Sequence, residues 1–141
     1  MAGKGMSDIY CWEIESDALK IYLASSSRGA LRVGISLDKG GDCMRYFRDI
    51  YPFERIVKDQ PRNSLLLKAV EAALYNRPDR NRLPLDIEAT SFQMKVWESL
   101  KRIPFGQTRT YGEMATMVGN PEGARAVGQA LGRNPLPLVF P

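Results

Sequence analysis

Two capping boxes fix where helices begin in the second half of the chain, and no other feature constrains its fold as strongly. In a capping box, a Ser or Thr at the helix start and a Glu or Gln three residues later each accept a backbone N–H from the other. Thr90 and Gln93 have this spacing, and so do Thr110 and Glu113. The helix that follows the first box has an inward apolar stripe, made of Phe92, Val96, Trp97 and Leu100. We therefore expect the second half to be helical.

A tight turn is expected to separate the second helix from a third. The second helix should run to about Val118, where Gly119 can close it. Asn120 then caps the next helix at once, with Pro121 at its first position and Glu122 beside the positive end of its dipole. Helix, three- or four-residue turn and helix is the layout of the helix-turn-helix DNA-binding proteins, although it is also common in proteins that never bind DNA.

The third helix has one apolar face and one polar face. The apolar stripe consists of Ala124, Val127 and Leu131, and three hydrogen-bond donors spaced by four lie opposite, namely Arg125, Gln129 and Arg133. One face can pack while the other presents donors. From the spacing alone, the polar face could also be an ordinary solvent-exposed helix surface that binds no ligand, because exposed arginines four residues apart are common on helices.

The first half has the pattern of an α+β module. Four apolar residues alternate with polar or small ones, as in a half-buried strand, namely Leu31, Val33, Ile35 and Leu37. Segments 9–14 and 19–24 are similar, and 25–29 is expected to be a turn. Helices are expected over 42–51 and after a cap at Asn63, and the polar, proline-interrupted segment 76–84 is the candidate linker. We thus expect a disordered start or tag over 1–5, an N-terminal α/β domain over 6–83 and a C-terminal domain over 84–141.

Composition excludes several kinds of site. The 141 residues include no histidine, which excludes Ser-His-Asp and Cys-His catalysis and His-ligated zinc within them. The two cysteines, Cys11 and Cys43, lack metal-ligand spacing, and we expect free buried thiols, with no metal and no cofactor. The net charge of +4 is compatible with a polyanionic partner. No apolar run approaches the roughly 20 residues of a membrane span and no secretion signal is evident, so we expect a cytoplasmic protein without membrane partners.

Four segments of the second half resemble, in order and spacing, the conserved blocks of the DNA-binding domain of the O6-alkylguanine-DNA alkyltransferases: 104–113, 119–121, 124–128 and 134–137. The resemblance implies a small N-terminal α/β domain, ribonuclease H-like, and a C-terminal helical domain, winged-helix-like, with a helix-turn-helix. It also implies direct reversal of DNA alkylation damage, with nucleotide flipping, by a monomer whose partner is double-stranded DNA containing O6-alkylguanine. The recognition helix is then expected in the minor groove, with little readout of sequence.

The resemblance also assigns roles to individual residues. Arg125 matches the arginine finger that fills the space left by a flipped guanine, Tyr111 the tyrosine that crowds the target phosphate, and Asn134 the asparagine that supports the turn around the site. The remaining DNA-contacting candidates are Thr110, Ala124, Gly128, Gln129 and Arg133, and the base pocket is expected to involve Tyr111, Leu131, Asn134 and Pro137. From the residues alone, Arg125 could instead form a surface ion pair, Tyr111 could be packing, Gly128 could only permit close packing and Asn134 could only form a turn.

The acceptor of the family's reaction is a cysteine in a Pro-Cys-His-Arg motif, which normally follows directly after a stretch like 132–141. The positions of that cysteine and its histidine lie beyond Pro141, so we expect these 141 residues to bind DNA without transferring the alkyl group, unless a further C-terminal segment completes the site. Whether the chain is an enzyme is left open. Two alternatives remain, a non-enzymatic alkyltransferase-like lesion sensor and a sequence-specific helix-turn-helix regulator.

Overall fold

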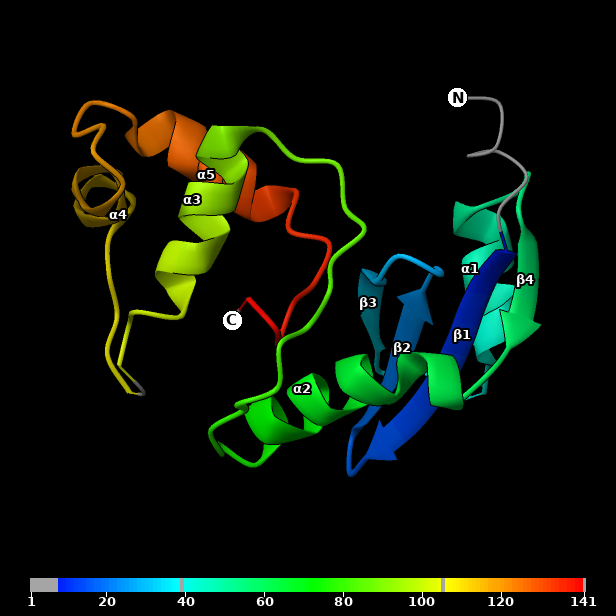
Figure 1. The fold of residues 1–141 in the computed structure, drawn as a ribbon. Helices are drawn as coiled ribbons and strands as arrows, with labels where there is room; N and C mark the ends of the chain where they lie inside the picture. Colours follow the sequence, from blue (N-terminus) through cyan, green and yellow to red (C-terminus); the bar gives the residue numbers. More distant parts are fainter. Residues whose placement is uncertain (1–7, 39, 105, 141) are drawn as a thin grey trace. The chain divides into compact units, whose positions relative to one another are not determined.

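The computed structural model describes residues 8–38, 40–104 and 106–140, so the start predicted over 1–5 lies outside the described residues. The chain divides into two compact units, unit 1 up to Ile87 and unit 2 from Glu88 onward (Figure 1). Unit 1 contains a mixed sheet with helices and unit 2 contains helices. The α+β class expected from the sequence is confirmed.

Unit 1 is built on a four-stranded sheet with the order β3-β2-β1-β4. Strands β1 (Asp8–Ser16), β2 (Leu19–Ser25) and β3 (Ala30–Ser36) form an antiparallel meander, and β4 (Arg55–Lys58) pairs in parallel with β1. Parallel strands need a crossover connection, and helix α1 (Cys43–Ile50) lies within it. The turn predicted over 25–29 is present, with reciprocal hydrogen bonds between the backbones of Ser26 and Gly29.

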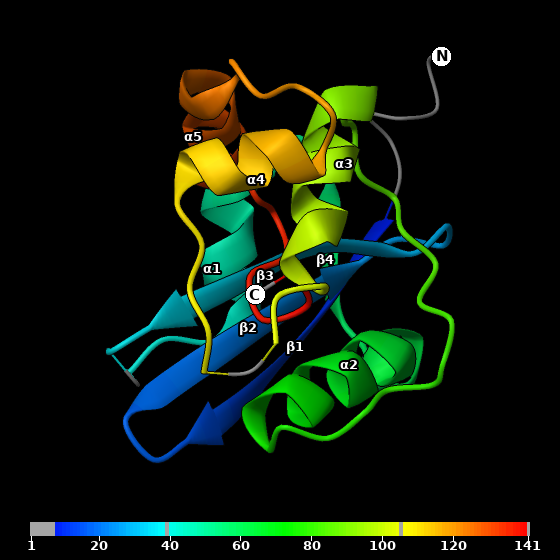
Figure 2. The ribbon, with the colours of Figure 1, turned by 90° about the vertical axis from the view of Figure 1, so that its left-hand side faces the viewer.

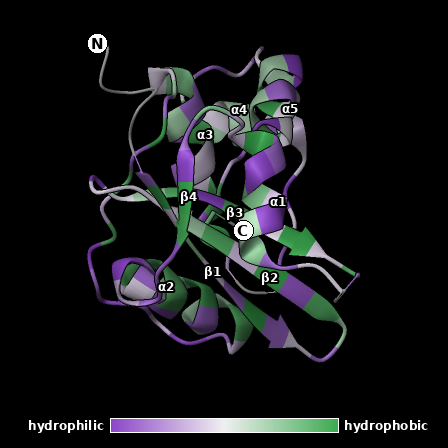
Figure 3. Cartoon of the chain, turned by 90° about the vertical axis from the view of Figure 1, so that its right-hand side faces the viewer, coloured by the Kyte–Doolittle hydropathy of each residue, from purple (hydrophilic) through white to green (hydrophobic). Residues whose placement is uncertain are grey.

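Helices cover the two faces of this sheet. Figure 2 shows α1 behind the sheet and α2 (Ser64–Leu74) in front of it. One buried cluster joins the sheet to α1 and consists of Ile9, Cys11, Tyr22, Ala24, Cys43 and Phe47. Because neighbouring residues of a strand point to opposite faces, Ile21 and Leu23 turn away from this cluster, and both are fully buried. Helix α2 carries hydrophobic and hydrophilic residues side by side (Figure 3), and it buries Leu66 and Val70.

The strand predicted around 31–37 is confirmed, but its apolar side is covered only in part. Val33 is buried, whereas Ile35 and Leu37 are 42% and 79% exposed. The reason is position, since β3 is an edge strand that ends at Ser36. On the other side of β3 the Tyr46 ring of α1 lies against Gly34, where even a β-carbon would collide with it.

Asn63 precedes α2, as predicted, but its side chain does not cap the helix. Its amide nitrogen instead donates to the carbonyl oxygens of Tyr10, at 3.1 Å, and Asp59, at 2.9 Å. Asn63 is only 1% exposed, so these bonds compensate for the burial of its amide nitrogen, whereas its Oδ1 is buried without a hydrogen-bond partner among the described residues. The amide thus fastens the start of α2 to strand β1, and the cap predicted from local sequence is wrong.

The boundary between the units lies between Ile87 and Glu88, whereas the sequence predicts it between 83 and 84. The difference comes from residues 84–86, which form a bridge with Ala30 at the edge of the sheet. The backbone of Ala30 donates to the oxygen of Pro84 and accepts from the nitrogen of Asp86, both at 2.8 Å. The Asp86 carboxylate also accepts a hydrogen bond from the Ser26 hydroxyl.

Unit 2 contains helices α3 (Ser91–Leu100), α4 (Tyr111–Met117) and α5 (Ala124–Gly132). Both predicted capping boxes are confirmed, at Thr90 with Gln93 and at Thr110 with Glu113. Trp97, which is buried, joins α3 to α5 because its indole nitrogen donates to the Ala130 carbonyl at 2.8 Å. None of the helices in the described part of the chain has the length and apolarity to cross a membrane.

The third helix begins later than predicted. Asn120 does not cap it, because the helix begins at Ala124, after Gly123. Residues 120–123 form a turn instead, closed by the Gly123 nitrogen, which donates to the Asn120 oxygen at 2.9 Å. A β-turn prefers Asn at its first position, Pro at its second and Gly at its fourth, as in Asn120, Pro121 and Gly123. The same residues therefore suit both a helix start and a β-turn. The connection between α4 and α5 therefore has six residues, 118–123, and is longer than the tight turn at Gly119 and Asn120 that the sequence predicts.

Candidate nucleic-acid interface

Helix α5 presents its donors to solvent. Arg125, Gln129 and Arg133 are exposed, as predicted, whereas Val127 and Ala130 are buried against the rest of unit 2. Ala124 and Leu131, which were predicted to pack, are half-buried. Among the described residues, none of the ion pairs includes Arg125. Within the described ranges, the surface ion pair considered for Arg125 from the sequence is thus not formed, which leaves its exposed guanidinium available to a ligand.

Tyr111 packs on α5 at Gly128. A β-carbon at Gly128 would lie 2.9 Å from Cε2 of the tyrosine ring, closer than such atoms approach one another, and 3.2 Å from Cδ2. The sequence suggested that Gly128 allows close approach of a neighbouring backbone, and the structure shows an aromatic ring there instead. Tyr111 remains 54% exposed, so one part of the ring packs while the rest is accessible. Arg125 precedes Gly128 by three residues, which places both on the same side of α5.

Thr110 fixes the start of α4 and so the position of the neighbouring Tyr111. The Thr110 hydroxyl oxygen accepts from the Glu113 nitrogen at 3.0 Å, and the Thr110 nitrogen donates to Glu113 Oε1 at 2.8 Å. Hydrogen bonds from the Thr110 backbone and side chain lower the pKa of Glu113. The carboxylate is thereby kept charged at the positive end of the helix dipole, where it is favourable.

Asn134 holds together the loop that follows α5. Its Oδ1 accepts from the Leu136 nitrogen at 2.9 Å, and its Nδ2 donates to the Phe140 oxygen at 2.8 Å. The Phe140 nitrogen also donates to the Leu136 oxygen at 2.9 Å, so the loop closes on itself. Leu138 has a φ of +76°, a left-handed conformation that strains a non-glycine residue and persists only when surrounding contacts impose it.

The core of unit 2 anchors the far end of the same loop. Phe140 is 2% exposed and stacks on Trp97, with ring centroids 6.0 Å apart, and Leu136 is fully buried. Pro137, a predicted pocket residue, lies half-buried between these two anchors. The apolar segment 136–140 forms a turn. Tyr111, Arg125 and this loop thus come from three consecutive parts of unit 2.

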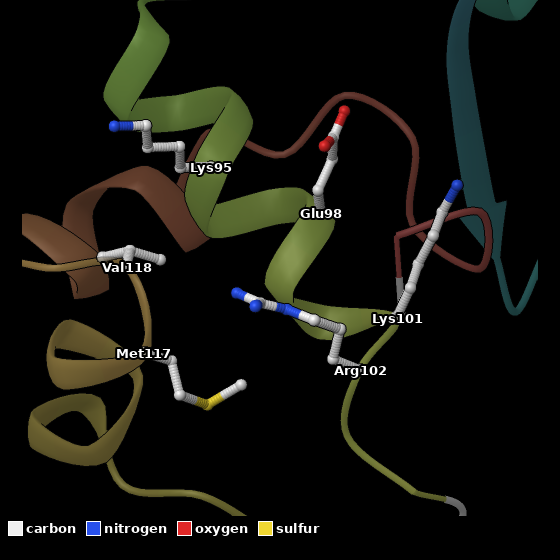
Figure 4. Close-up of a pocket in the computed structure, with 6 residues that line it drawn as sticks. All are labelled: Lys95, Glu98, Lys101, Arg102, Met117 and Val118. Atoms are coloured by element: carbon white, nitrogen blue, oxygen red, sulfur yellow. The ribbon is translucent and has the colours of Figure 1, made fainter.

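A basic hollow between α3 and the end of α4 was not predicted from the sequence. It has a volume of about 640 Å³ and is lined by Lys95, Glu98, Lys101, Arg102, Met117 and Val118. Figure 4 shows Arg102, in the turn after α3, with its side chain extending toward the side of the hollow formed by Met117 and Val118. Positions 95, 98 and 102 are three and four residues apart, and this helical spacing was the sequence signal that could have placed them on one side of a helix. The hollow adds positive charge to unit 2 outside the α5 face.

Both thiols lie in unit 1 and are free and buried, as predicted. Unexpectedly, the two sulfur atoms are neighbours, 2.7 Å apart. Within the described ranges, no group of three or more His, Cys, Asp or Glu side chains could hold a metal ion.

Comparisons with known proteins point to one family. Residues 91–141 match the family described as "6-O-methylguanine DNA methyltransferase, DNA binding domain". An inducible methylated-DNA–protein-cysteine methyltransferase of Bacillus subtilis is 33% identical over 122 residues, covering 85% of this chain and 67% of that protein. A methylated-DNA–protein-cysteine methyltransferase of Methanosarcina acetivorans is 56% identical over 54 residues, which cover 38% of this chain and 35% of that protein.

Solved structures agree with the sequence matches. The crystal structure of Mycobacterium tuberculosis O6-methylguanine methyltransferase has a TM-score of 0.68 and 28% identity, covering 94% of this chain and 75% of that one. A structure of the M. tuberculosis protein in complex with DNA has a TM-score of 0.66 and 28% identity, covering 95% of this chain and 74% of that one. The matches to the first relatives span little more than a third of their length. With the fold, the helix arrangement and these matches in agreement, the chain belongs to the family of O6-alkylguanine-DNA alkyltransferases, the methylated-DNA–protein-cysteine methyltransferases.

Proposed function

We propose that unit 2 binds double-stranded DNA and holds an O6-alkylguanine turned out of the duplex, as part of DNA repair. The observation that supports this most is the two-sided helix α5, which buries Val127 and exposes the donors of Arg125, Gln129 and Arg133. Cationic side chains on such a face neutralise phosphates and release counterions, which gives affinity with little dependence on sequence. By resemblance to the family, the helix lies in the minor groove.

Arg125 is proposed to occupy the space in the base stack that the flipped nucleotide leaves. Extruding a base costs a few kcal/mol of lost stacking and pairing, and a group that fills the gap offsets part of that cost. A guanidinium suits this role because it is planar, charged and able to stack on bases while it donates hydrogen bonds. Arg125 is exposed near the N-terminal end of α5, and no ion pair among the described residues restrains it.

Tyr111 and the loop held by Asn134 are proposed to form the pocket for the extruded base. The Tyr111 ring rests on Gly128, three residues after Arg125, so the finger and the ring share one short part of α5. The hydrogen bonds of Asn134 fix the loop backbone beside the end of the same helix. Leu131 and Pro137, both half-buried, would add apolar surface to this pocket. Thr110 is proposed to contact a phosphate through its exposed hydroxyl.

The reaction known in the family is transfer of the alkyl group from guanine O6 to a cysteine sulfur, without a metal. In these 141 residues the cysteines are Cys11 and Cys43, and both are fully buried in unit 1. An attacking thiolate has to reach the alkyl carbon directly, which a buried sulfur in a packed cluster cannot do. We therefore propose that residues 1–141 bind the lesion without accepting its alkyl group.

A comparison of two duplexes tests the proposal. One duplex contains O6-methylguanine and the other contains guanine at the same position, and binding is followed by fluorescence anisotropy. We expect tighter binding to the lesion duplex, affinity for both duplexes that falls with salt, and no added methyl on the protein by intact mass. Arg125→Ala should remove most of the lesion preference. Arg28→Ala, which deletes the same charge at an exposed position of unit 1, should retain it.

The outcomes separate the alternative functions. Equal affinity for the two duplexes in wild-type protein, with preference for one undamaged sequence, would support a sequence-specific regulator and contradict lesion binding. A methyl group on Cys11 or Cys43 would contradict the proposed lack of transfer. Lesion preference without added mass is the result expected for the proposed lesion binder, and a non-enzymatic sensor of the alkyltransferase-like kind would behave in the same way.

A further inference from the structure

The two cysteines form a pair that the proposed DNA-binding function does not use. Cys11 lies in β1 and Cys43 is the first residue of α1, 32 positions later in the chain. Their sulfur atoms are 2.7 Å apart, and both side chains are fully buried in the cluster between the sheet and α1. Two thiols brought together from separate elements in one packed cluster differ from a single buried cysteine, since each has a reaction partner within reach.

Charged groups surround this pair on one side. The backbone nitrogen of Cys43 donates to Glu13 Oε1 at 2.8 Å, and the ammonium group of Lys58 lies 3.6 Å from the same oxygen. The second Glu13 oxygen is 2.6 Å from Lys20 Nζ. The hydrogen bond to Cys43 lowers the pKa of Cys11 more than burial raises it, and Lys58 acts in the same direction. That hydrogen bond and burial both raise the pKa of Cys43. The two thiols therefore titrate as a coupled pair that shares one ionisation.

We propose that Cys11 and Cys43 are a modification site at which a small hydroperoxide closes a disulfide between β1 and the start of α1. A disulfide bond is about 2.05 Å long, so the sulfurs need to approach by only about 0.6 Å from their present separation. Burial selects the oxidant, because hydrogen peroxide can penetrate a packed cluster far more readily than a bulky disulfide such as oxidised glutathione.

The chemistry balances in two steps. The Cys11 thiolate attacks one oxygen of hydrogen peroxide, which gives a sulfenic acid on Cys11 and releases hydroxide, and the hydroxide combines with the proton lost from the thiol to form water. The Cys43 sulfur then attacks the Cys11 sulfur, the S–S bond forms, and the sulfenic oxygen leaves with the Cys43 proton as a second water. Overall, two thiols are oxidised, one peroxide is reduced and two water molecules are formed.

The crosslink would stabilise unit 1. It joins positions 32 apart, and a crosslink across a loop of this size restricts the unfolded chain strongly while changing the folded chain little. Peroxide treatment should therefore raise the melting temperature by at least about 4 °C. Since the thiols lie in unit 1, DNA affinity of unit 2 is expected to stay the same, which makes this inference independent of the proposed function.

The experiment treats the whole chain with stoichiometric hydrogen peroxide and measures its intact mass under denaturing, non-reducing conditions. We expect a monomer that has lost the mass of two hydrogen atoms, a peptide pair linking Cys11 to Cys43, and recovery of both thiols with dithiothreitol. Native protein should react slowly with oxidised glutathione and form no mixed disulfide at equal concentration. Two thiols that still react with maleimide after peroxide and denaturation would overturn the proposal, as would oxygen addition without the crosslink.

Single variants identify the attacking sulfur. In Cys43→Ser, Cys11 has no resolving partner, and we expect a sulfenic acid that dimedone captures. In Cys11→Ser, we expect slower oxidation, because the attacking sulfur is gone and burial still raises the pKa of Cys43. If the two variants oxidise at equal rates, the assignment of Cys11 as the attacking residue is wrong. Should either variant fail to fold, the mass of oxidised wild-type protein still decides whether the crosslink forms.

Discussion

Gly128→Ala should weaken lesion binding while the protein stays folded, because of one contact. The added β-carbon would lie 2.9 Å from Cε2 of Tyr111, closer than two such atoms pack, so the ring has to move. Tyr111 is 54% exposed, which leaves it room to turn toward solvent. A ring displaced in this way no longer occupies the place in which we propose that it supports the extruded base.

The magnitude follows from two opposing effects. Replacing glycine by alanine inside a helix stabilises it by about 0.5–1 kcal/mol, because glycine has more conformational freedom to lose. Overpacking typically costs about 1–3 kcal/mol, and less where a neighbour can move aside. Gly132→Ala is the matched control, since it lies in the same helix and a β-carbon there meets nothing within 4 Å. Because the exposed Tyr111 ring can move aside, we expect Gly128→Ala to be less stable than Gly132→Ala by about 1 kcal/mol, the low end of this range.

Urea unfolding and anisotropy with the lesion duplex measure the two effects separately. Gly132→Ala should bind the duplex like the wild type, and Gly128→Ala should bind at least about tenfold more weakly, which corresponds to about 1.4 kcal/mol. A double-mutant cycle with Tyr111→Ala completes the test, because Gly128→Ala should have no further effect once the ring is gone. The reasoning fails if Gly128→Ala and Gly132→Ala are equally stable, or if Gly128→Ala still weakens binding without the ring.

Three further substitutions test the packing that supports the units. Trp97→Phe deletes the hydrogen bond to the Ala130 oxygen and should cost about 1–2 kcal/mol in urea unfolding, whereas an unchanged midpoint would show that the bond contributes nothing. Thr110→Ala removes the cap of α4 and should cost about 0.5–2 kcal/mol, with Thr110→Ser close to wild type in the same assay. Burial raises the pKa of Glu13, but hydrogen bonds from Lys20 and a backbone nitrogen, with two lysine charges, leave it below 4.5. The resulting stability is present above that pH and lost in acid, so Glu13→Gln should flatten the fall in unfolding free energy measured between about pH 6 and pH 3.

Features set by neighbouring residues were predictable from the sequence. Both capping boxes depend on residues three apart, and both are present, at Thr90 and Thr110. The face of α5 follows from helical spacing, so the exposure of Arg125 could also be predicted. The start of α5 could not, because Asn120 suits a helix cap and a β-turn equally well in local terms. In the folded chain the Gly123 nitrogen donates to the Asn120 oxygen, which closes the turn, and the helix begins only at Ala124.

Features set by distant residues were missed for a common reason. Asn63 has the local signature of a cap, yet its amide bonds to Tyr10, 53 positions earlier. The sulfurs of Cys11 and Cys43 meet across 32 positions, and no spacing rule relates them. Strand β4 has only four residues, too few for an alternating pattern, and its pairing with β1 defines it. In each case a tertiary contact chose among conformations that the local sequence allowed.

The bonds of Asn134 have a consequence for how such a protein can change over time. A single amide closes the loop after α5, and its partners, Leu136 and Phe140, lie within six positions of it. The indole of Trp97 reaches the same helix from inside unit 2. The surface that we propose for DNA binding is thus encoded by one continuous stretch of unit 2, residues 97–140, so this stretch could be moved into another protein while the preceding sheet changes independently.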